Sequence, residues 1–351
     1  MKRILLLVLL ALLIIAGSAT AWAYRELHTA IRHTKQGQYV EIARGSSPTA
    51  VVNKLASEGI IKHKWPLTLY LKLIARGTEL KAGEYDFPSP ISPLAVFARL
   101  REGEQRMLRL TVIEGWTRWD IANAMLKIPE LRLAETYEAL RLMDNVDLIK
   151  DLDPRAKNLE GYIFPDSYDF PPNTRAADVI KMMVKRFHRE WKPEWSQRAR
   201  ELGMTPREVV TTASLIETEA KLSDERPLVA SVIYNRLKRG TALAVDSSIV
   251  YASKLEGKWR NDGKVYKSDV ERRSPYNTRL HAGLPPGPIA APGKSSLEAA
   301  LYPANTDYLF YVRDPARDDG AHNFYDNERD FGVGVQALRN WEAQRDAAQA
   351  K

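Results

Sequence analysis

The first 23 residues constrain this chain more than any other stretch, because they contain one long uncharged run. Lys2 and Arg3 are followed by twenty residues without a charge, Ile4–Ala23. A helix of that length extends about 30 Å, at roughly 1.5 Å per residue, which matches the hydrocarbon core of a bilayer. Basic residues ahead of the run favour a cytoplasmic N-terminus. The segment is therefore predicted to direct the rest of the chain across a membrane.

Two interpretations of this segment differ in whether it is kept. A cleaved signal peptide would use Ile4–Ile15 as its apolar core and end at the small residues of 19–23, which are A-x-A-like. A signal anchor would keep the segment as a transmembrane helix, with Trp22 and Tyr24 at the membrane interface. We favour an anchor over residues 1–24, because the apolar run continues to the full spanning length. Either way the remaining residues are exported.

The composition is that of a globular protein with a basic balance. The chain has 351 residues, of which 44% are hydrophobic and 27% charged, and this length suggests two or three domains. The absence of cysteine excludes disulfides, thiolate metal sites and a cysteine nucleophile. A net charge of +8 suits nucleic acid, anionic lipid or an acidic polymer, or serves solubility alone. Export argues against nucleic acid and favours the membrane and cell-wall polymer.

Two stretches about seventy residues apart, 40–55 and 110–125, share one pattern. In each, an alternating strand leads through a glycine to a Ser or Thr helix cap and then to apolar residues at helical spacing. The pair predicts two small βα units, and Thr117 with Asp120 resembles a capping box. Further predicted helices are Trp65–Arg76, Pro93–Arg101, Ala176–Trp191, Thr205–Lys221, Arg226–Arg239 and Gly332–Gln349. Further predicted strands are Leu80–Phe87, Leu159–Asp166 and Tyr308–Val312. Because these elements lack regular βαβ alternation, the predicted fold class is α+β.

The common catalytic motifs are missing from the sequence. It contains no G-x-S-x-G, no P-loop, no dinucleotide fingerprint and no H-E-x-x-H. Its six histidines lack paired ligand spacing, so we predict neither a metal nor a cofactor. Acid–base chemistry by carboxylates remains.

One glutamate stands out on the helix predicted around Ala213. Glu217 continues the apolar stripe of that helix, whereas Glu219 falls about 200° away, toward the polar side. A carboxylate on an apolar face loses hydration, so its pKa should rise toward the range that a general acid needs. The alternative is that Glu217 marks the edge of the stripe and pairs with an arginine such as Arg226 or Arg236.

Other polar residues follow in the same region. Asn235, Arg236, Asp246, Tyr276 and Asn277 offer hydrogen bonds suited to sugar hydroxyl and acetamido groups. Each can equally be structural, because Asn and Asp are common turn residues and Arg forms surface pairs.

At these residues the chain resembles the endolytic murein transglycosylase, or YceG-like, family. The resemblance runs from the anchor to about residue 335. It is carried by residues 114–117, 159–166, 213–219, 225–226, 229–237, Asp246 with 250–251, 276–278, 283–289, 292–293, 308–312 and 322–324. The chain departs from the family pattern at Thr218, where a lysine is common, and at Ser247, where a proline often follows the aspartate.

The resemblance implies a single-pass protein of the inner (cytoplasmic) membrane with its bulk in the periplasm. It implies a LysM-like module over residues 37–103, a second βα module or connector over 104–175 and a catalytic domain over 176–351. It implies Glu217 as the catalytic residue. Glu219 joins the five polar residues above as the candidate substrate-binding set, and no cofactor is needed.

The activity implied by the resemblance is endolytic cleavage of nascent peptidoglycan between N-acetylmuramic acid and N-acetylglucosamine. The products would be 1,6-anhydromuramyl ends, strand elongation would stop, and peptidoglycan synthases would be expected partners. Two alternatives stay open. One is a lysozyme-like hydrolase that uses Glu217 and Asp246. The other is a non-catalytic wall-binding scaffold, against which the intact motif at Glu217 argues.

Overall fold

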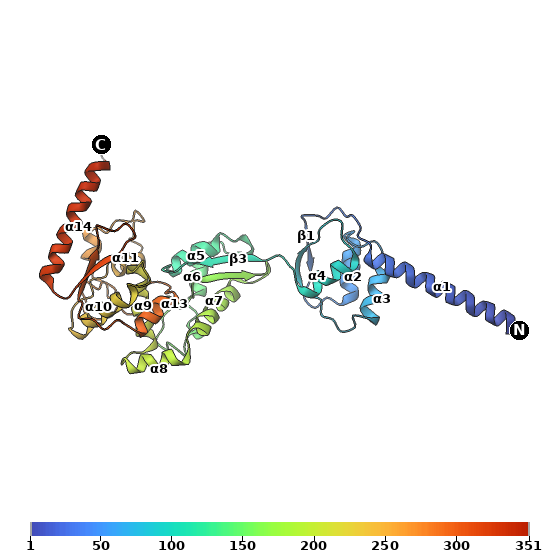
Figure 1. Ribbon diagram of the computed structural model, residues 1–351, viewed down its shortest axis with the longest axis horizontal. Coiled ribbons are helices and arrows are strands. Elements are labelled where there is room, and N and C mark those ends of the chain that lie inside the picture. The colour runs from blue at the N-terminus through green and yellow to red at the C-terminus, as the bar shows by residue number, and fades with distance from the viewer. Residues whose placement is uncertain (1, 350–351) are drawn as a thin grey trace. The chain divides into compact units, whose positions relative to one another are not determined.

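The computed structural model describes residues 2–349, so both ends of the chain fall just outside it. Met1, in the predicted anchor, and residues 350–351, in the predicted catalytic domain, lie outside the described residues. Helices and short strands are mixed along the chain (Figure 1), which confirms the predicted α+β class. The internal contacts divide the chain into two compact units, an N-terminal unit of Met1–Arg109 with Asp169–Thr174 and a C-terminal unit of Leu110–Tyr168 with Arg175–Lys351.

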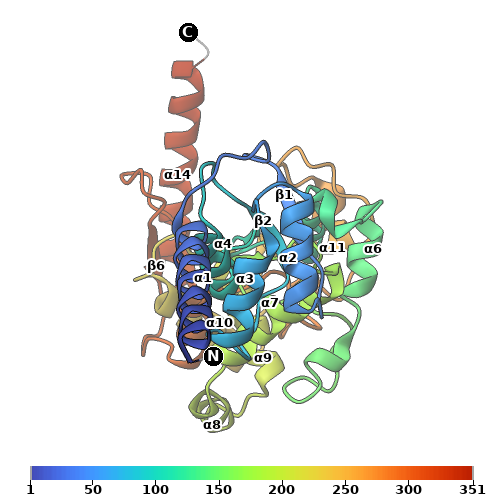
Figure 2. The ribbon, with the colours of Figure 1, turned by 90° about the vertical axis from the view of Figure 1, so that its right-hand side faces the viewer.

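The N-terminal unit begins with one long apolar helix and continues as a small mixed fold. Its elements are α1 (Lys2–His28), β1 (Tyr39–Ile42), α2 (Pro48–Ser57), α3 (Lys64–Leu73), β2 (Gly83–Asp86) and α4 (Pro93–Glu102). α1 is long and apolar enough to span a membrane, and the large side chains of residues 4–10 are more than half exposed. This agrees with the predicted anchor. α1 also contacts α3 and α4 (Figure 2).

The core of the N-terminal unit lies behind a two-stranded antiparallel sheet. β1 pairs with β2, with Val40 opposite Tyr85. The alternation along the strands puts Val40, Ile42 and Tyr85 in the core, where Leu55 of α2 joins them. α3 ends at Leu73, three residues before the predicted end of this helix, because the chain then turns through Ala75–Thr78.

The C-terminal unit contains the remaining elements, and the limits of the two units fall inside β3 and β4. The strands are β3 (Leu108–Val112), β4 (Asp166–Phe170), β5 (Phe310–Arg313) and β6 (His322–Tyr325), paired as β3 with β4 and β5 with β6. The helices are α5 (Arg118–Leu126), η1 (Pro129–Leu131), α6 (Thr136–Leu142), η2 (Val146–Leu148), α7 (Ala176–Glu190), α8 (Pro193–Glu201), α9 (Pro206–Glu219), α10 (Arg226–Lys238), α11 (Asp246–Leu255), α12 (Lys267–Val270), α13 (Lys294–Leu301) and α14 (Glu328–Gln349).

The repeated strand–glycine–helix pattern is confirmed in both places. Gly45 and Gly115 take the same left-handed backbone, with φ of 75° and 79°. Such φ values favour glycine, so the residue type permits the sharp turn from strand to helix. The capping box is also present, because the Asp120 carboxylate accepts the backbone N–H of Thr117 at 2.9 Å.

One local prediction was wrong and one helix was missed, both at prolines. The strand predicted over 159–166 is a turn, in which the Tyr162 N–H donates to the Leu159 carbonyl at 3.0 Å, and β4 begins only at Asp166. The helix predicted over 176–191 does end before Pro193, because α7 stops at Glu190, but Pro193 also begins α8, which we did not predict. Proline suits the first helical position because it has no N–H that would need a partner there.

The turn at 159–163 is tightly packed inside the C-terminal unit. Gly161 has a φ of 82°, and a Cβ atom built on it would lie 2.4 Å from the Cβ of Pro288 and 3.1 Å from Val210 of α9. Glycine therefore allows the turn, the 283–293 loop and α9 to approach one another. Nearby, the buried Asp153 accepts hydrogen bonds from Tyr162 and Arg207, which join the same parts of the chain.

We predict that Gly161→Ala lowers the free energy of unfolding of the C-terminal unit, by about 1–3 kcal/mol for the forced contact with Pro288. Gly203→Ala is the matched control, because Gly203 has a φ of 69° but no atom within 4 Å of an added Cβ. It should show only the cost of the left-handed backbone, about 1–2 kcal/mol. Urea denaturation of the two variants measures the difference, and equal losses would contradict the packing argument.

Candidate active site

Glu217 lies in the last turn of α9, which is the buried central helix of the C-terminal unit. The helix starts with a capping box, in which the Glu208 carboxylate accepts the Thr205 N–H at 2.8 Å. Every residue of 209–216 is buried. The Glu217 side chain is only 4% exposed, which confirms that it lies on the apolar face.

Two donors from other helices meet the Glu217 carboxylate. The backbone N–H of Gly293, the N-cap residue of α13, donates to Glu217 Oε2 at 2.7 Å. The guanidinium of Arg226, at the start of α10, donates to Glu217 Oε1 at 2.9 Å. α13 and α10 both pack against α9, so helix packing sets the positions of these donors. The ion pair that we considered as an alternative to catalysis therefore exists, and its partner is Arg226.

A second carboxylate, that of Glu114, lies beside this pair. Its segment is joined to the 283–293 loop by two backbone hydrogen bonds, from the Gly115 N–H to the Ala291 carbonyl at 2.9 Å and from the Ala291 N–H to the Trp116 carbonyl at 2.8 Å. Glu114 Oε2 lies 3.6 Å from Nη2 of Arg226, and the side chain is 48% exposed. Arg226 thus lies between an enclosed carboxylate and a half-exposed one.

Gly293 makes this arrangement possible because it has no side chain. A Cβ atom built on Gly293 would lie 1.9 Å from Glu114 Oε1. Its φ of −74° is open to any residue, so the requirement for glycine here is one of space and not of backbone conformation.

The pKa of Glu217 is raised above its ordinary value. Burial is the main cause, because the charged form loses hydration. The Gly293 N–H and the Arg226 charge favour the ionised form and oppose the rise, whereas the Glu114 charge adds to it. The side chain is thus fitted to hold a proton at higher pH than a free carboxyl group does, and its ionised form still has two donors.

Glu219 is partly buried and hydrogen-bonded, although the helical period placed it toward the polar side of α9. Tyr311 of β5 donates its hydroxyl to Glu219 Oε2 at 2.9 Å, and Ser247 of α11 donates to Oε1 at 3.2 Å. Thr218 and Ser247 are themselves in contact, with their hydroxyl oxygens 2.7 Å apart. Burial raises the pKa of Glu219. Tertiary packing of α11 and β5 has covered the side that the isolated helix would leave polar.

Three of the candidate binding residues hold the fold of the C-terminal unit. Asn235 donates to the carbonyls of Thr306 and Tyr308, both at 2.8 Å. Arg236 donates to the Leu309 carbonyl at 2.6 Å and to two further carbonyls before α11. Asn277 has no exposed surface and donates to two carbonyls of its own loop. A role for these side chains in sugar binding stays a prediction.

Asp246 is exposed and Tyr276 is half-buried, and neither forms a hydrogen bond or ion pair with Glu217. Asp246 accepts two hydrogen bonds from Arg279, at 2.6 and 2.9 Å, and its charge acts on Glu219. The Tyr276 ring lies 5.0 Å from the ring of Tyr251. The carboxylate that acts on Glu217 is therefore Glu114, and Asp246 belongs to the neighbouring Glu219 group.

From the sequence we did not assign Glu114 or Gly293 to the site. We considered Arg226 only as a structural ion-pair partner of Glu217. Each lies in a motif that carries the family resemblance, which was the available signal. Their convergence on Glu217 could not be seen, because Glu114 is about a hundred residues away along the chain.

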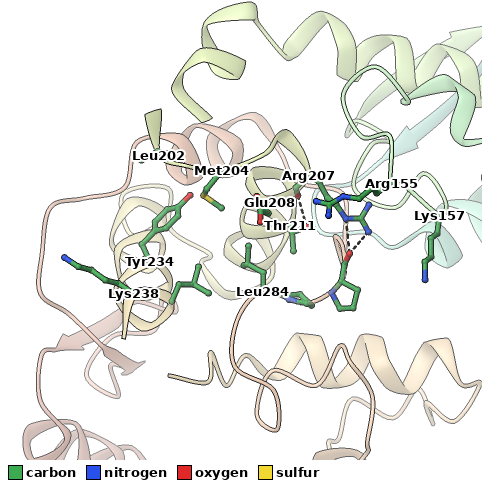
Figure 3. Close-up of a pocket in the computed structure, with 13 residues that line it drawn as sticks. Arg155, Lys157, Leu202, Met204, Arg207, Glu208, Thr211, Tyr234, Lys238 and Leu284 are labelled. Carbon is green, nitrogen blue, oxygen red and sulfur yellow. Dashed lines mark hydrogen bonds between the residues drawn. The ribbon is translucent and has the colours of Figure 1, made fainter. Parts of the chain in front are cut away.

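A cavity of about 680 Å³ lies elsewhere in the C-terminal unit (Figure 3). Arg207, Glu208 and Thr211 of α9 line it, and they precede Glu217 by about two to three helical turns. Arg207 reaches the carbonyl of Pro286 on the 283–293 loop. Size alone would point to this cavity, but the enclosed and paired carboxylates mark the other end of α9 as the place for chemistry.

Taken together, the fold and the site define an α+β protein with an N-terminal helix long and apolar enough to span a membrane and an enclosed glutamate of raised pKa. The chain belongs to the YceG-like family, whose sequence profile matches residues 40–337.

Individual relatives agree with this assignment. The endolytic murein transglycosylase of Bacillus subtilis is 32% identical over 314 residues, which cover 85% of each chain. The endolytic murein transglycosylase of Streptococcus pneumoniae is 28% identical over 335 residues, and the match spans 88% of this chain but 60% of that longer protein. The crystal structure of a YceG-like protein from Listeria monocytogenes superposes with a TM-score of 0.57 at 29% identity, covering 84% of this chain and 98% of that one.

Glu160 is a further enclosed carboxylate of the C-terminal unit, in the turn that contains Gly161. It is 3% exposed and accepts the backbone N–H of Arg118 at 3.1 Å. Burial raises its pKa to about 7, although the hydrogen bond from Arg118, its charge and a hydrogen bond from Tyr251 oppose the rise. Glu160 therefore binds a proton in the folded protein at a pH where the unfolded chain has released it.

We predict that the wild type loses stability relative to a Glu160→Gln variant as the pH rises from about 4.5 to about 7. In this window the folded state binds more protons than the unfolded state, so the free energy of unfolding falls with pH, by at most about 3 kcal/mol. Below the window both states are protonated, and above it the difference is constant. Unfolding of both proteins across pH 4–8 measures this effect, and parallel curves would contradict it.

Proposed function

We propose that this protein is an endolytic transglycosylase that cleaves the glycan strands of peptidoglycan. Membership of the YceG-like family and the names of the Bacillus and Streptococcus relatives support this activity. The observation that carries the chemistry is the Glu217 carboxyl group, which is enclosed, raised in pKa and supplied with a donor at each oxygen. The bond cleaved would join N-acetylmuramic acid to N-acetylglucosamine.

In the first step, protonated Glu217 donates its proton to the glycosidic oxygen. The bond from the muramyl anomeric carbon to that oxygen breaks, its electron pair stays with the oxygen, and the sugar develops oxocarbenium character. Burial favours the protonated starting form. Arg226 and the Gly293 N–H stabilise the carboxylate that this step leaves behind.

In the second step, the muramyl 6-hydroxyl attacks the anomeric carbon and Glu217 accepts its proton. A 1,6-anhydro end forms, the acid is regenerated and no water is consumed. One carboxylate suffices because the nucleophile belongs to the substrate itself, which gives it the advantage of proximity. Glu114 acts through Arg226 and through its charge, which helps to keep the pKa of Glu217 high.

Hydrolysis is the second candidate reaction, and it would need another carboxylate to activate water. Asp246, which we predicted for this role, is held by Arg279. Glu114 is the half-exposed carboxylate beside Glu217, so a hydrolase of this geometry would use Glu114 instead. Product analysis separates the two reactions, because hydrolysis leaves reducing muramyl ends and transglycosylation leaves anhydro ends.

We further propose that α1 anchors the chain in the cytoplasmic membrane and that the residues after α1 lie on the periplasmic side. The basic residues that precede its apolar run support this orientation. Within the exported part, we propose a LysM-like module over residues 37–103, a βα connector over 104–175 and a catalytic domain over 176–351. Cleavage of strands as they are made would stop their elongation, and peptidoglycan synthases would then be partners.

We predict that Glu217→Gln abolishes cleavage of purified peptidoglycan, with a loss of at least about 100- to 10,000-fold. Glutamine keeps the shape of the side chain and an acceptor for Arg226, but it cannot donate and recover the proton. Mass spectrometry of soluble products from the wild type should show anhydro ends, and the variant should release none.

The control is Glu298→Gln, which removes a half-exposed carboxylate from α13 and should leave the products unchanged. Circular dichroism checks that the Glu217→Gln variant folds. Anhydro products from a folded Glu217→Gln variant would overturn the assignment of Glu217, and reducing ends from the wild type would establish hydrolysis.

We predict that Glu114→Gln moves the alkaline limb of the activity profile to lower pH. The Glu114 charge raises the pKa of Glu217, so its removal lowers that pKa and leaves less of the acid protonated near neutral pH. The measurement is kcat/KM against pH on a soluble glycan substrate.

Glu298→Gln is again the matched control, because Glu298 and Glu114 have nearly equal exposures of 47% and 48%. An unchanged limb, or one displaced to higher pH in Glu114→Gln, would contradict the electrostatic role of Glu114.

A further inference from the structure

We propose that α3 of the N-terminal unit lies in the membrane interface, in the leaflet that faces the exported part of the chain. The inference rests on α1 spanning a bilayer and is independent of the proposed reaction. It gives the N-terminal unit a second contact with lipid, besides its covalent attachment to α1.

α3 is apolar on two sides, although only one side is needed for the core of the unit. Leu67 and Leu71 are 2% and 7% exposed and belong to the core. On the other side, Leu69, Leu73 and the adjoining Ile74 are 44%, 71% and 74% exposed. A surface helix of a soluble domain normally presents polar residues on its outer face, so this outer face indicates an apolar environment.

The outer face of α3 is continuous with the surface of the predicted membrane helix. A groove of about 350 Å³ separates the two helices, lined by Ala19 and Ala23 of α1 and by Leu69 and Leu73 of α3. Near one end of the groove the Trp22 and Trp65 rings stack, with centroids 5.0 Å apart and planes at 19°. Stacked tryptophans at this level are typical of a membrane–water interface.

The position of the groove along α1 gives its depth in the bilayer. The apolar run ends at Ala23, before Tyr24 and Arg25, so Ala19 lies within about 6 Å of the outer edge of the hydrocarbon core, at roughly 1.5 Å per residue. Because the groove begins at that level, the α3 side chains that line it lie where acyl chains meet headgroups.

The charges around this face suit an anionic lipid surface. Arg25, Lys62, Lys64, Lys72 and Arg76 are exposed near the two helices. Lysine and arginine beside an apolar face bind anionic headgroups while the apolar side chains enter the interface. We therefore assign the face to the bilayer and not to a second copy of the chain, whose α3 would carry the same positive charges.

The test uses the absence of cysteine from the natural sequence. Leu73→Cys places one thiol on the outer face of α3 in the full chain, and a nitrobenzoxadiazole label is attached to it. Asn53→Cys on α2, also exposed, is the matched control. Both proteins are reconstituted into vesicles of phosphatidylethanolamine and phosphatidylglycerol, with or without nitroxide-labelled lipid.

We expect the label at residue 73 to emit at shorter wavelength than the label at residue 53, and nitroxide lipid to quench it several-fold more strongly. Adding Leu69→Glu should weaken this quenching, whereas Leu69→Met should not. Circular dichroism checks that the variants fold, which the exposure of both positions favours.

Equal quenching at residues 73 and 53 would overturn the proposal. A blue-shifted label that nitroxide lipid does not quench, and that becomes exposed when the protein is diluted, would overturn it as well. That outcome would assign the outer face of α3 to contact between copies of the chain.

Discussion

The enclosed Glu217 carboxylate is the group on which the helix packing of the C-terminal unit depends. An ionised carboxylate away from water is costly unless donors reach it, and each hydrogen bond to a charged group contributes roughly 1.5–3 kcal/mol. Here the donors come from the first residue of α10 and the N-cap residue of α13, so the packing of both helices on α9 is tied to one side chain. Stability and chemistry therefore depend on the same contacts.

The opposing effects on the pKa of Glu217 explain why several groups surround its carboxylate. Burial alone would keep the acid protonated and make it a reluctant proton donor, because its charged form would lack hydration. Arg226 and the Gly293 N–H alone would keep it ionised. Glu114 Oε2 lies 3.6 Å from the same Nη2 atom of Arg226 that contacts Glu217, so Glu114 shares the charge of that arginine. The combination leaves the pKa of Glu217 above its ordinary value, while two donors remain for its ionised form.

Much of the fold could be predicted because its signals are local. Capping residues such as Thr205 and Thr117 fixed helix starts, and the helical period placed Glu217 on the buried side of α9. The same helical period did not predict the surroundings of Glu219, because Tyr311 comes from a strand about ninety residues later and covers this side chain. The approach of Glu114 to Gly293 was likewise beyond sequence reasoning, since it depends on backbone bonds between distant loops.

The contact between Thr218 and Ser247 has a consequence for substitution at either position. From the sequence, both are departures from the pattern expected of the family, and their hydroxyl groups lie 2.7 Å apart beside Glu219. Residues in direct contact do not contribute independently to stability. A proline at 247 would remove the hydroxyl that contacts Thr218 and donates to Glu219, while Thr218 would keep the carbonyls of Ser214 and Leu215 as partners. Substitution at either site is expected to be epistatic to the other.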